Sequence, residues 1–182
     1  MIKHIAAAAM VAFLAGGASA QVYVGGALGT SKLSASCSGT TSCDTSDGAW
    51  KLYVGNALND TWAVEVAYLD FGKAKRSDGV AADQIKASAL VAAAAGRWSF
   101  AQDWSAMGRL GLAYARASYR YAEPGFSFSE SDSKIKAYVG LGLAYSVTPN
   151  LSLTLDADFT TAEVLDDSGA LRAVTLGAAY RF

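Results

Sequence analysis

The sequence predicts an all-β fold: a transmembrane, antiparallel, up-and-down barrel of eight strands. Three observations lead to this prediction. The chain starts with an export signal, its later segments alternate between apolar and small or polar residues, and it ends on a strand with two aromatic residues. After the signal, no apolar run approaches the roughly 20 residues of a membrane-spanning helix. Strands can satisfy their backbone hydrogen bonds in lipid only in a closed barrel.

Residues 1–20 have the features of a secretory signal peptide. Lys3 supplies a positive start, residues 5–15 form an unbroken apolar run, and residues 18–20 are the small residues of a cleavage site. We therefore expect the mature protein to be a single barrel domain that comprises residues 21–182.

Eight segments of the mature chain alternate with the two-residue period of a half-buried strand. In order, they are residues 21–31, 50–58, 62–68, 85–96, 104–117, 134–145, 151–159 and 171–182. Longer connections are expected at residues 32–48, 73–83, 118–133 and 163–169. Long and short connections alternate, so both termini lie on the side of the short turns, which faces the periplasm in such barrels.

The first three strands are justified by their two faces. The first sets valines and a leucine against glycines and an alanine, although Tyr23 falls among the small residues. The second and third alternate in the same way on either side of a tight turn at Asn59 and Asp60. Asp70 falls on the apolar face of the third, so we expect a bulge or an early strand end there.

The fourth and fifth strands differ in how clearly they alternate. The fourth has alanines on both faces; we place Lys86 and Ser88 on its inward face and allow for a bulge. The fifth begins at Trp104 and sets leucines against serine, arginine and glycine. Trp98 and Phe100 lie in the connection between them, and with Trp104 they are typical of an aromatic girdle at a membrane interface.

The last three strands alternate most clearly. The sixth opposes six apolar residues to lysines, glycines and a tyrosine, and the seventh opposes leucines to serine, threonine and aspartate. A turn at residues 148–150 joins them. The eighth carries Tyr180 and Phe182 on its apolar face, so the chain ends as a strand with one side suited to lipid.

The end of the chain resembles the terminal strand by which outer-membrane β-barrels of Gram-negative bacteria are recognised for insertion. The residues that carry this resemblance are Thr175, Gly177, Tyr180 and Phe182. Residues 51–72 and 136–153 resemble the OmpA-like family of small eight-stranded barrels, and we expect a barrel-only member without a periplasmic domain. The resemblance implies an outer-membrane location, contact with outer-membrane lipid and lipopolysaccharide, and the barrel-assembly machinery as partner during insertion.

A soluble barrel with an apolar interior would alternate equally well. Two features favour a barrel in a membrane over a soluble barrel. Glycines such as Gly111 and Gly140 on the polar face suit a crowded lumen, and aromatic residues gather at strand ends, where a bilayer interface lies. Arg116 and Arg172 share the apolar face, but strand geometry places both near a rim of the lipid band.

Seven charged residues belong to the inward faces. They are Lys51, Glu65, Lys86, Arg109, Lys136, Asp156 and Asp158. Four bases and three acids nearly balance, and a barrel of eight strands is just wide enough for side chains to fill it. We therefore expect paired charges that close the lumen, because burial of each ion alone is costly. A narrow, porin-like channel for ions or small solutes is the alternative.

Cys37 and Cys43, the two cysteines of the sequence, lie in the first long loop. In an oxidising compartment we expect them to form a disulfide. A metal site is less favoured, because no further cysteine or histidine of the mature chain is available as a ligand. We expect no cofactor.

The composition argues against nucleic-acid binding and catalysis. The 15 lysines and arginines balance 16 aspartates and glutamates without a basic block. His4, the sole histidine, lies in the signal, so the usual general base is missing from the mature chain.

The sequence thus favours a monomeric protein with a structural or cell-surface interaction role, and adhesion through the loops is a further alternative. Tyr119, Tyr121, Phe126 and Phe128 give the third long loop apolar surface for an extracellular partner. At the outer rim, Arg116, Arg120 and Arg172 have geometry suited to lipopolysaccharide phosphates.

Overall fold

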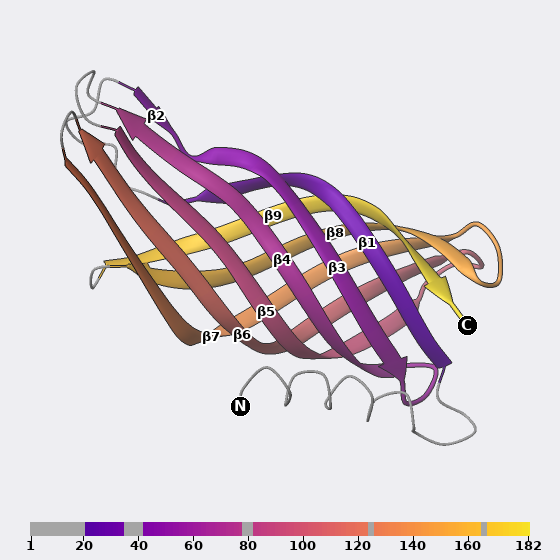
Figure 1. Ribbon diagram of the computed structural model, residues 1–182. Helices are drawn as coiled ribbons and strands as arrows, with labels where there is room; N and C mark the ends of the chain where they lie inside the picture. The colour runs from indigo at the N-terminus through magenta and orange to yellow at the C-terminus, as the bar shows by residue number, and fades with distance from the viewer. Residues whose placement is uncertain (1–20, 35–41, 78–81, 124–125, 165–166) are drawn as a thin grey trace.

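The computed structural model of the protein describes residues 21–34, 42–77, 82–123, 126–164 and 167–182. The strands in these ranges are β1 (Gln21–Leu33), β2 (Ser42–Asp44), β3 (Ser46–Ala57), β4 (Trp62–Ser77), β5 (Ala82–Ser99), β6 (Trp104–Glu123), β7 (Phe126–Ser146), β8 (Leu151–Val164) and β9 (Asp167–Arg181) (Figure 1). Within these ranges, no helix has the length and apolarity needed to cross a bilayer.

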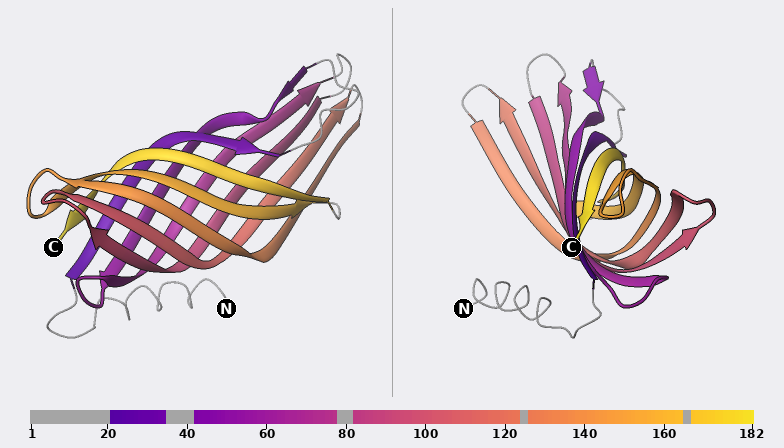
Figure 2. Two further views of the ribbon diagram at one scale, coloured as in Figure 1. Left: turned by 180° about the vertical axis from the view of Figure 1, so that it is seen from behind. Right: turned by 90° about the vertical axis from the view of Figure 1, so that its right-hand side faces the viewer.

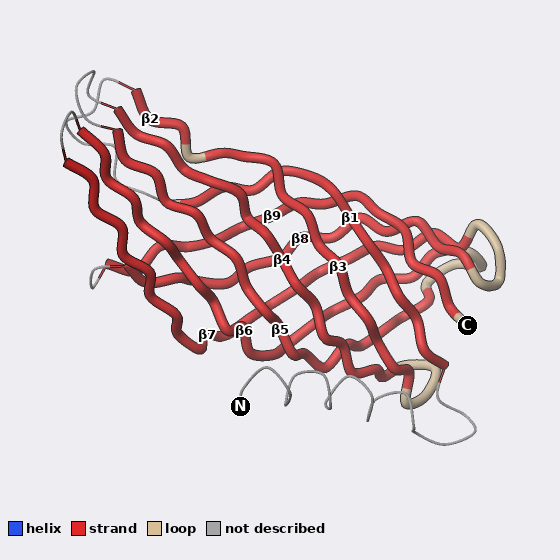
Figure 3. The backbone as a smooth tube through the Cα atoms, viewed as in Figure 1, coloured by secondary structure: helices blue, strands red, loops and turns tan. Residues whose placement is uncertain are grey.

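Eight long strands close into the predicted antiparallel barrel. Each pairs with the next along the chain, and β1 closes the barrel by pairing with β9, where Val24 lies opposite Tyr180. The extra strand β2 extends the sheet by pairing with the outer end of β4. The tan turns 58–61, 100–103 and 147–150 lie at the same end as residue 182 (Figure 3). The predicted fold class is confirmed.

Apolar side chains cover the outside of the barrel. Leu28, Leu110 and Leu176 are 73%, 67% and 65% exposed, whereas the alternate positions of the same strands are buried or nearly so. An exterior of this kind would expose a large apolar surface to water, and it is therefore suited to lipid.

The apolar exterior ends at one level across three neighbouring strands. Leu90 of β5 and Ile135 of β7 flank Tyr114 of β6, and all three are exposed apolar or aromatic residues. Two residues further from the short turns, the corresponding outward positions are Ser88, Arg116 and Ser133. Arg116 therefore lies just beyond the lipid-facing band, as the sequence predicted.

Lys86 does not face the lumen, so its predicted inward position is wrong. Alanines occupy both faces of β5, but its exposed large apolar side chains, Leu90 and Trp98, share the even-numbered face and point outward. Lys86 belongs to that face, about half of its side chain is exposed, and its Nζ lies 3.5 Å from Oδ2 of Asp70. It is a charge of the outer rim.

The irregularity expected at Asp70 is a β-bulge. Four residues of β4, from Asp70 to Lys73, lie opposite three residues of β5, from Ser88 to Lys86. Gly72 takes up the bulge with φ = 67°, a conformation that favours glycine. Its N–H donates to Oδ1 of Asp70 at 2.8 Å, which holds this outward-phase carboxylate against the backbone.

The strands run further beyond the lipid band than the sequence predicted. The loop expected at 118–133 is wrong: β6 continues to Glu123 and pairs with β7 from Phe126 onward. The loops expected at 73–83, 163–169 and 32–48 are likewise shortened by paired strand residues. The missed segments lie beyond the lipid-facing band and contain many polar residues, so they were interpreted as loops. Aromatic residues of the outermost segment nevertheless recur with the two-residue period of a strand, at positions 119 and 121 and at positions 126 and 128.

The outer parts of the strands form an asymmetric extension. The ladder between β6 and β7 reaches Phe126, whereas the ladder between β7 and β8 stops at Val139. The outer ends of β4 to β7 consequently diverge from those of β8 and β9 (Figure 2). We call β6 and β7 beyond Arg116 and Ser133 the outer hairpin.

Tyr23 points into the lumen, which explains its place among small residues. Tyr23 lies opposite Gly55, and Gly25 lies opposite Tyr53. A side chain at either glycine would overlap the tyrosine ring on the neighbouring strand. Each tyrosine therefore occupies the space above a glycine, and the two rings meet edge to face with centroids 6.4 Å apart.

Candidate functional site

Five charged side chains meet in the lumen, and we call them the lumen charge cluster: Lys51 of β3, Glu65 of β4, Arg109 of β6, and Asp156 and Asp158 of β8. Each lies on the inward face because its two sequence neighbours face lipid. The five residues are at most 3% exposed. Ions buried this deeply must be paired and hydrogen-bonded.

Arg109 lies at the centre of the cluster. Its Nε donates to Oε2 of Glu65 at 2.5 Å, and its Nη1 donates to Oδ1 of Asp156 at 2.7 Å. The hydroxyl of Tyr23 donates to the other oxygen of Glu65 at 2.6 Å. One guanidinium thus bridges carboxylates from two strands on different sides of the barrel.

Lys51 forms the second ion pair. Its Nζ lies 3.0 and 3.1 Å from the two carboxylate oxygens of Asp158, and 3.9 Å from Oδ2 of Asp156. The hydroxyl of Tyr138 also donates to Asp158. Lys51 and Arg109 lie 5.4 and 5.8 Å from the centroid of the Tyr53 ring, at cation–π distance.

Glycines of β7 make the space that the central arginine occupies. A Cβ at Gly142 would come within 2.5 Å of Asp156 Oδ1 and 3.1 Å of Arg109 Nη1. One at Gly140 would come within 3.2 Å of Arg109 carbon atoms. The glycines on the polar face of this strand therefore accommodate a crowded lumen.

The structure gathers five of the seven charges that the sequence assigned to the lumen. Lys136 shares the inward side with Ala113, its partner on β6, and is half-buried one inward position beyond Tyr138. Lys86 lies on the outer rim. Three further members of the site, Tyr23, Tyr53 and Tyr138, were not predicted, although their inward phase in the sequence was the available signal.

The cluster can close the lumen but shows no arrangement for metal chemistry. Its three carboxylates each contact a cationic group. Among the described residues, no group of three or more His, Cys, Asp or Glu side chains is placed to hold a metal ion.

The terminal strand has its predicted two faces. Thr175 is buried in the lumen, whereas Tyr180 and Phe182 are exposed on the outside with ring centroids 5.1 Å apart. Gly177 faces inward against the backbone of β1. Recognition of these residues by the assembly machinery stays a prediction.

Two predictions fall on residues that the structure does not describe. The signal peptide covers residues 1–20, and Cys37 belongs to the range 35–41. Cys43 lies in β2, but its side chain is not among those described. The cleavage site and the disulfide therefore stay predictions.

A closed barrel with a lipid-facing exterior and a charged interior defines the class: membrane-spanning β-barrels. The family model of the OmpA-like transmembrane domain matches residues 17–182. The chain therefore belongs to the OmpA-like family of small outer-membrane β-barrels, as its sequence resemblance indicated. None of the curated proteins compared matches the chain.

Solved structures of small barrels share the fold. Ail, the attachment invasion locus protein of Yersinia pestis, is 21% identical over 89% of this chain and 98% of its own, with a TM-score of 0.61. Neisserial surface protein A is 18% identical over 88% and 97%, with a TM-score of 0.66. The N-terminal barrel of Pseudomonas aeruginosa OprF is 15% identical over 89% and 97%, with a TM-score of 0.53. At these sequence identities, the similarity to the three structures establishes a shared fold alone.

Proposed function

We propose that this protein is a sealed barrel of the Gram-negative outer membrane, with a structural role or a role in contacts at the cell surface. The observation that carries the proposal is the lumen charge cluster. Arg109 and Lys51 connect β3, β4, β6 and β8 across the lumen through buried ion pairs. An ion that crossed the barrel would have to separate these pairs, at a high cost in free energy.

Planar-bilayer recordings test the sealed lumen. We expect the refolded wild-type protein to show little or no steady conductance. A Glu65→Ala/Arg109→Ala variant removes both partners of one pair and is expected to show measurable openings. Stable, reproducible channels of the wild-type protein would contradict a sealed lumen and favour the narrow, porin-like channel.

The outer hairpin supports the surface role. It raises β6 and β7 beyond the lipid-facing band as a paired ladder, which holds its side chains in fixed positions. Arg120 and Phe128 are exposed on the outer hairpin, and Arg116 is exposed at its base. Arginine suits the phosphates of lipopolysaccharide and the sulfates of anionic saccharides. Ail has been crystallised in complex with sucrose octasulfate, a heparin analogue. Anionic saccharides are accordingly the proposed surface partners.

Shortening the outer hairpin tests the surface role. Ser118 and Ser131 are direct partners, so an Asn-Gly turn between them would replace residues 119–130 without a change of register. We expect cells that display this variant to lose adhesion to heparin-coated surfaces, while the barrel still shows the gel shift of a folded protein on heating.

The β8–β9 hairpin supplies the matched control. Joining Ala162 to Gly169, also direct partners, with the same turn shortens that hairpin instead. This control is expected to adhere like the wild type. Equal adhesion of all three proteins would contradict a surface role of the outer hairpin and leave the structural role.

An enzymatic role is not part of the proposal. OmpT, an outer-membrane protease of Escherichia coli, shares the barrel at 9% identity and a TM-score of 0.53, so the fold alone does not exclude catalysis. Residues 21–182 contain no histidine to serve as general base, and the buried carboxylates are bound to Arg109 and Lys51.

A further inference from the structure

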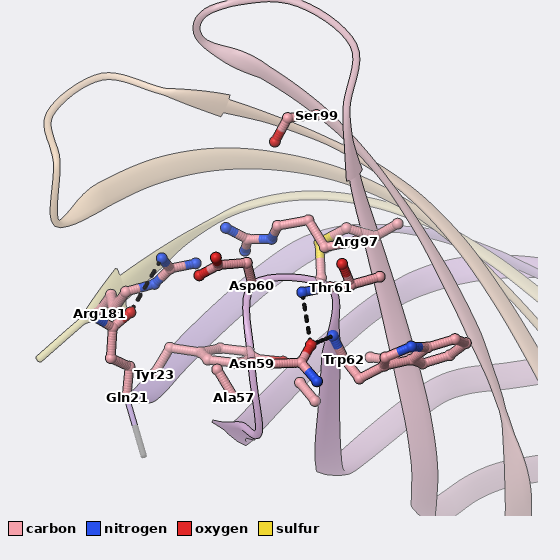
Figure 4. Close-up of a pocket in the computed structure, with 13 residues that line it drawn as sticks. Gln21, Tyr23, Ala57, Asn59, Asp60, Thr61, Trp62, Arg97, Ser99 and Arg181 are labelled. Atoms are coloured by element: carbon pink, nitrogen blue, oxygen red, sulfur yellow. Dashed lines mark hydrogen bonds between the residues drawn. The ribbon is translucent and has the colours of Figure 1, made fainter. Parts of the chain in front are cut away.

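A second charged site lies at the short-turn end of the lumen, apart from the lumen charge cluster. A cavity of about 350 Å³ opens there between the β3–β4 turn and the ends of β1, β5 and β9 (Figure 4). Arg97 of β5 and Arg181 of β9 line it, together with Asp60 of the turn, Ser99 and Tyr23. From the sequence, Arg97 was predicted to lie in a connection, and Arg181 was not among the predicted inward charges.

The two arginines carry positive charge that the described residues do not pair. Both are half-buried, and each repels the other electrostatically. Within the described part of the chain, no ion pair joins either guanidinium to a carboxylate. Arg181 donates to the neutral side chain of Gln21 at 3.3 Å. Two confined like charges favour an anion between them.

The β3–β4 turn presents a single acidic group to this cavity. The side chain of Asn59 accepts hydrogen bonds from the N–H groups of Thr61 and Trp62 at 2.9 and 2.8 Å, which fixes the turn. Asp60 follows Asn59, and in Figure 4 its carboxylate is directed toward the same part of the cavity as the two guanidinium groups. One exposed carboxylate opposes two arginines, so the cavity keeps a net positive charge.

The cavity is closed at its inner end, which faces the lumen charge cluster. The ring of Tyr23 lines it, and the hydroxyl of Tyr23 donates to Glu65 of the lumen charge cluster. Met107 also lines it, and its Sδ lies 3.8 Å from Nη2 of Arg109. A solute that enters from the periplasmic side would therefore meet the sealed cluster and stop.

We propose that this cavity binds a phosphate group, either inorganic phosphate or the phosphate of a small ester. Guanidinium groups donate paired hydrogen bonds that match the geometry of phosphate oxygens, and Ser99 adds a neutral hydroxyl to the wall. The volume is at the lower end of the range of small-molecule sites, which leaves room for a small ester beyond the phosphate itself. This site is separate from the proposed surface role at the other end of the barrel.

Phosphate titration of the full protein in uncharged detergent micelles, followed by calorimetry, tests the proposal. We expect saturable binding that weakens at least about tenfold in Arg97→Gln and in Arg181→Gln, because each loses charge-assisted hydrogen bonds. Asp60→Asn is expected to tighten binding by about two- to fivefold, because it removes the opposing charge from an exposed turn. Lys32→Gln is the control: it removes an exposed cation of β1 at the opposite end and should bind like the wild type.

Two further arms distinguish the sources of the phosphate. Glycerol 3-phosphate should compete with inorganic phosphate if a soluble ester can occupy the cavity. In phosphatidylcholine bilayers, added phosphatidylglycerol should lower the apparent phosphate affinity only if a lipid headgroup reaches the same arginines. In that case, phosphatidylglycerol should have no such effect on the Arg97→Gln protein. A gel shift on heating shows that each variant is folded. The proposal is overturned if phosphate does not bind saturably to the wild-type and Asp60→Asn proteins, or if Lys32→Gln weakens binding as much as Arg97→Gln.

Discussion

Replacement of Arg109 by methionine is expected to destabilise the folded barrel by about 3–5 kcal/mol. Methionine keeps much of the volume of the side chain, but it leaves Glu65 and Asp156 in the lumen without the guanidinium that now bridges them. Both carboxylates are buried, at 3% and 1% exposure, so water cannot replace the lost partner without a rearrangement. Equilibrium urea unfolding of the refolded protein in lipid vesicles measures the change.

Two further variants separate the effect of charge from that of packing. Arg116→Met makes the same substitution on the same strand at an exposed, outward position, and it should change the free energy of unfolding by no more than about 0.5 kcal/mol. Adding Glu65→Gln and Asp156→Asn to Arg109→Met removes the two carboxylate charges that lost their partner, and it should restore more than half of the lost free energy of unfolding. If Arg109→Met costs less than about 1 kcal/mol, the ion pairs do not hold the lumen closed.

The phase of most strands could be predicted because lipid and lumen demand opposite chemistry on alternate residues. Leu28, Leu110 and Leu176 are found on the outside, and Lys51, Glu65 and Asp158 on the inside. β5 was the exception, because alanine is accepted on both faces. The predicted inward position of Lys86 therefore depended on the least informative strand of the barrel.

Strand ends and lumen partners were harder to predict than strand phase. The outer hairpin lies beyond the lipid-facing band, and its many polar residues were interpreted as a loop, although aromatic residues at 119 and 121 and at 126 and 128 alternate as in a strand. Tyr23 and Tyr138 donate to Glu65 and Asp158, but a sequence shows inward tyrosines without showing which carboxylate each one contacts. The phosphate site likewise requires the closure of the barrel, which brings Arg97 and Arg181 together from distant segments.

Replacement of Gly177 by alanine is expected to impair folding of the barrel even in the absence of any assembly machinery. The sequence pattern explains this glycine as part of an insertion signal, but the structure supplies a second reason for it. A Cβ at Gly177 would overlap the carbonyl oxygen of Gly26 and lie 2.5 and 2.6 Å from the Cβ and Cα of Ala27, on the strand that closes the barrel. Backbone atoms cannot turn aside as a side chain can, so β1 and β9 must separate locally. We expect a loss of about 1–3 kcal/mol or more.

Refolding of purified protein into detergent micelles, with the folded fraction read from the gel shift on heating, tests this packing effect by itself. Gly108→Ala is the matched control: Gly108 is an exposed glycine of β6, and a Cβ there would meet nothing within 4 Å, so this variant should refold like the wild type. Normal refolding of Gly177→Ala, with reduced insertion in cells alone, would mean that Gly177 acts in recognition and not in packing. Impaired refolding in micelles would show that Gly177 is needed for closure of the barrel, although it also belongs to the residues that resemble an insertion signal.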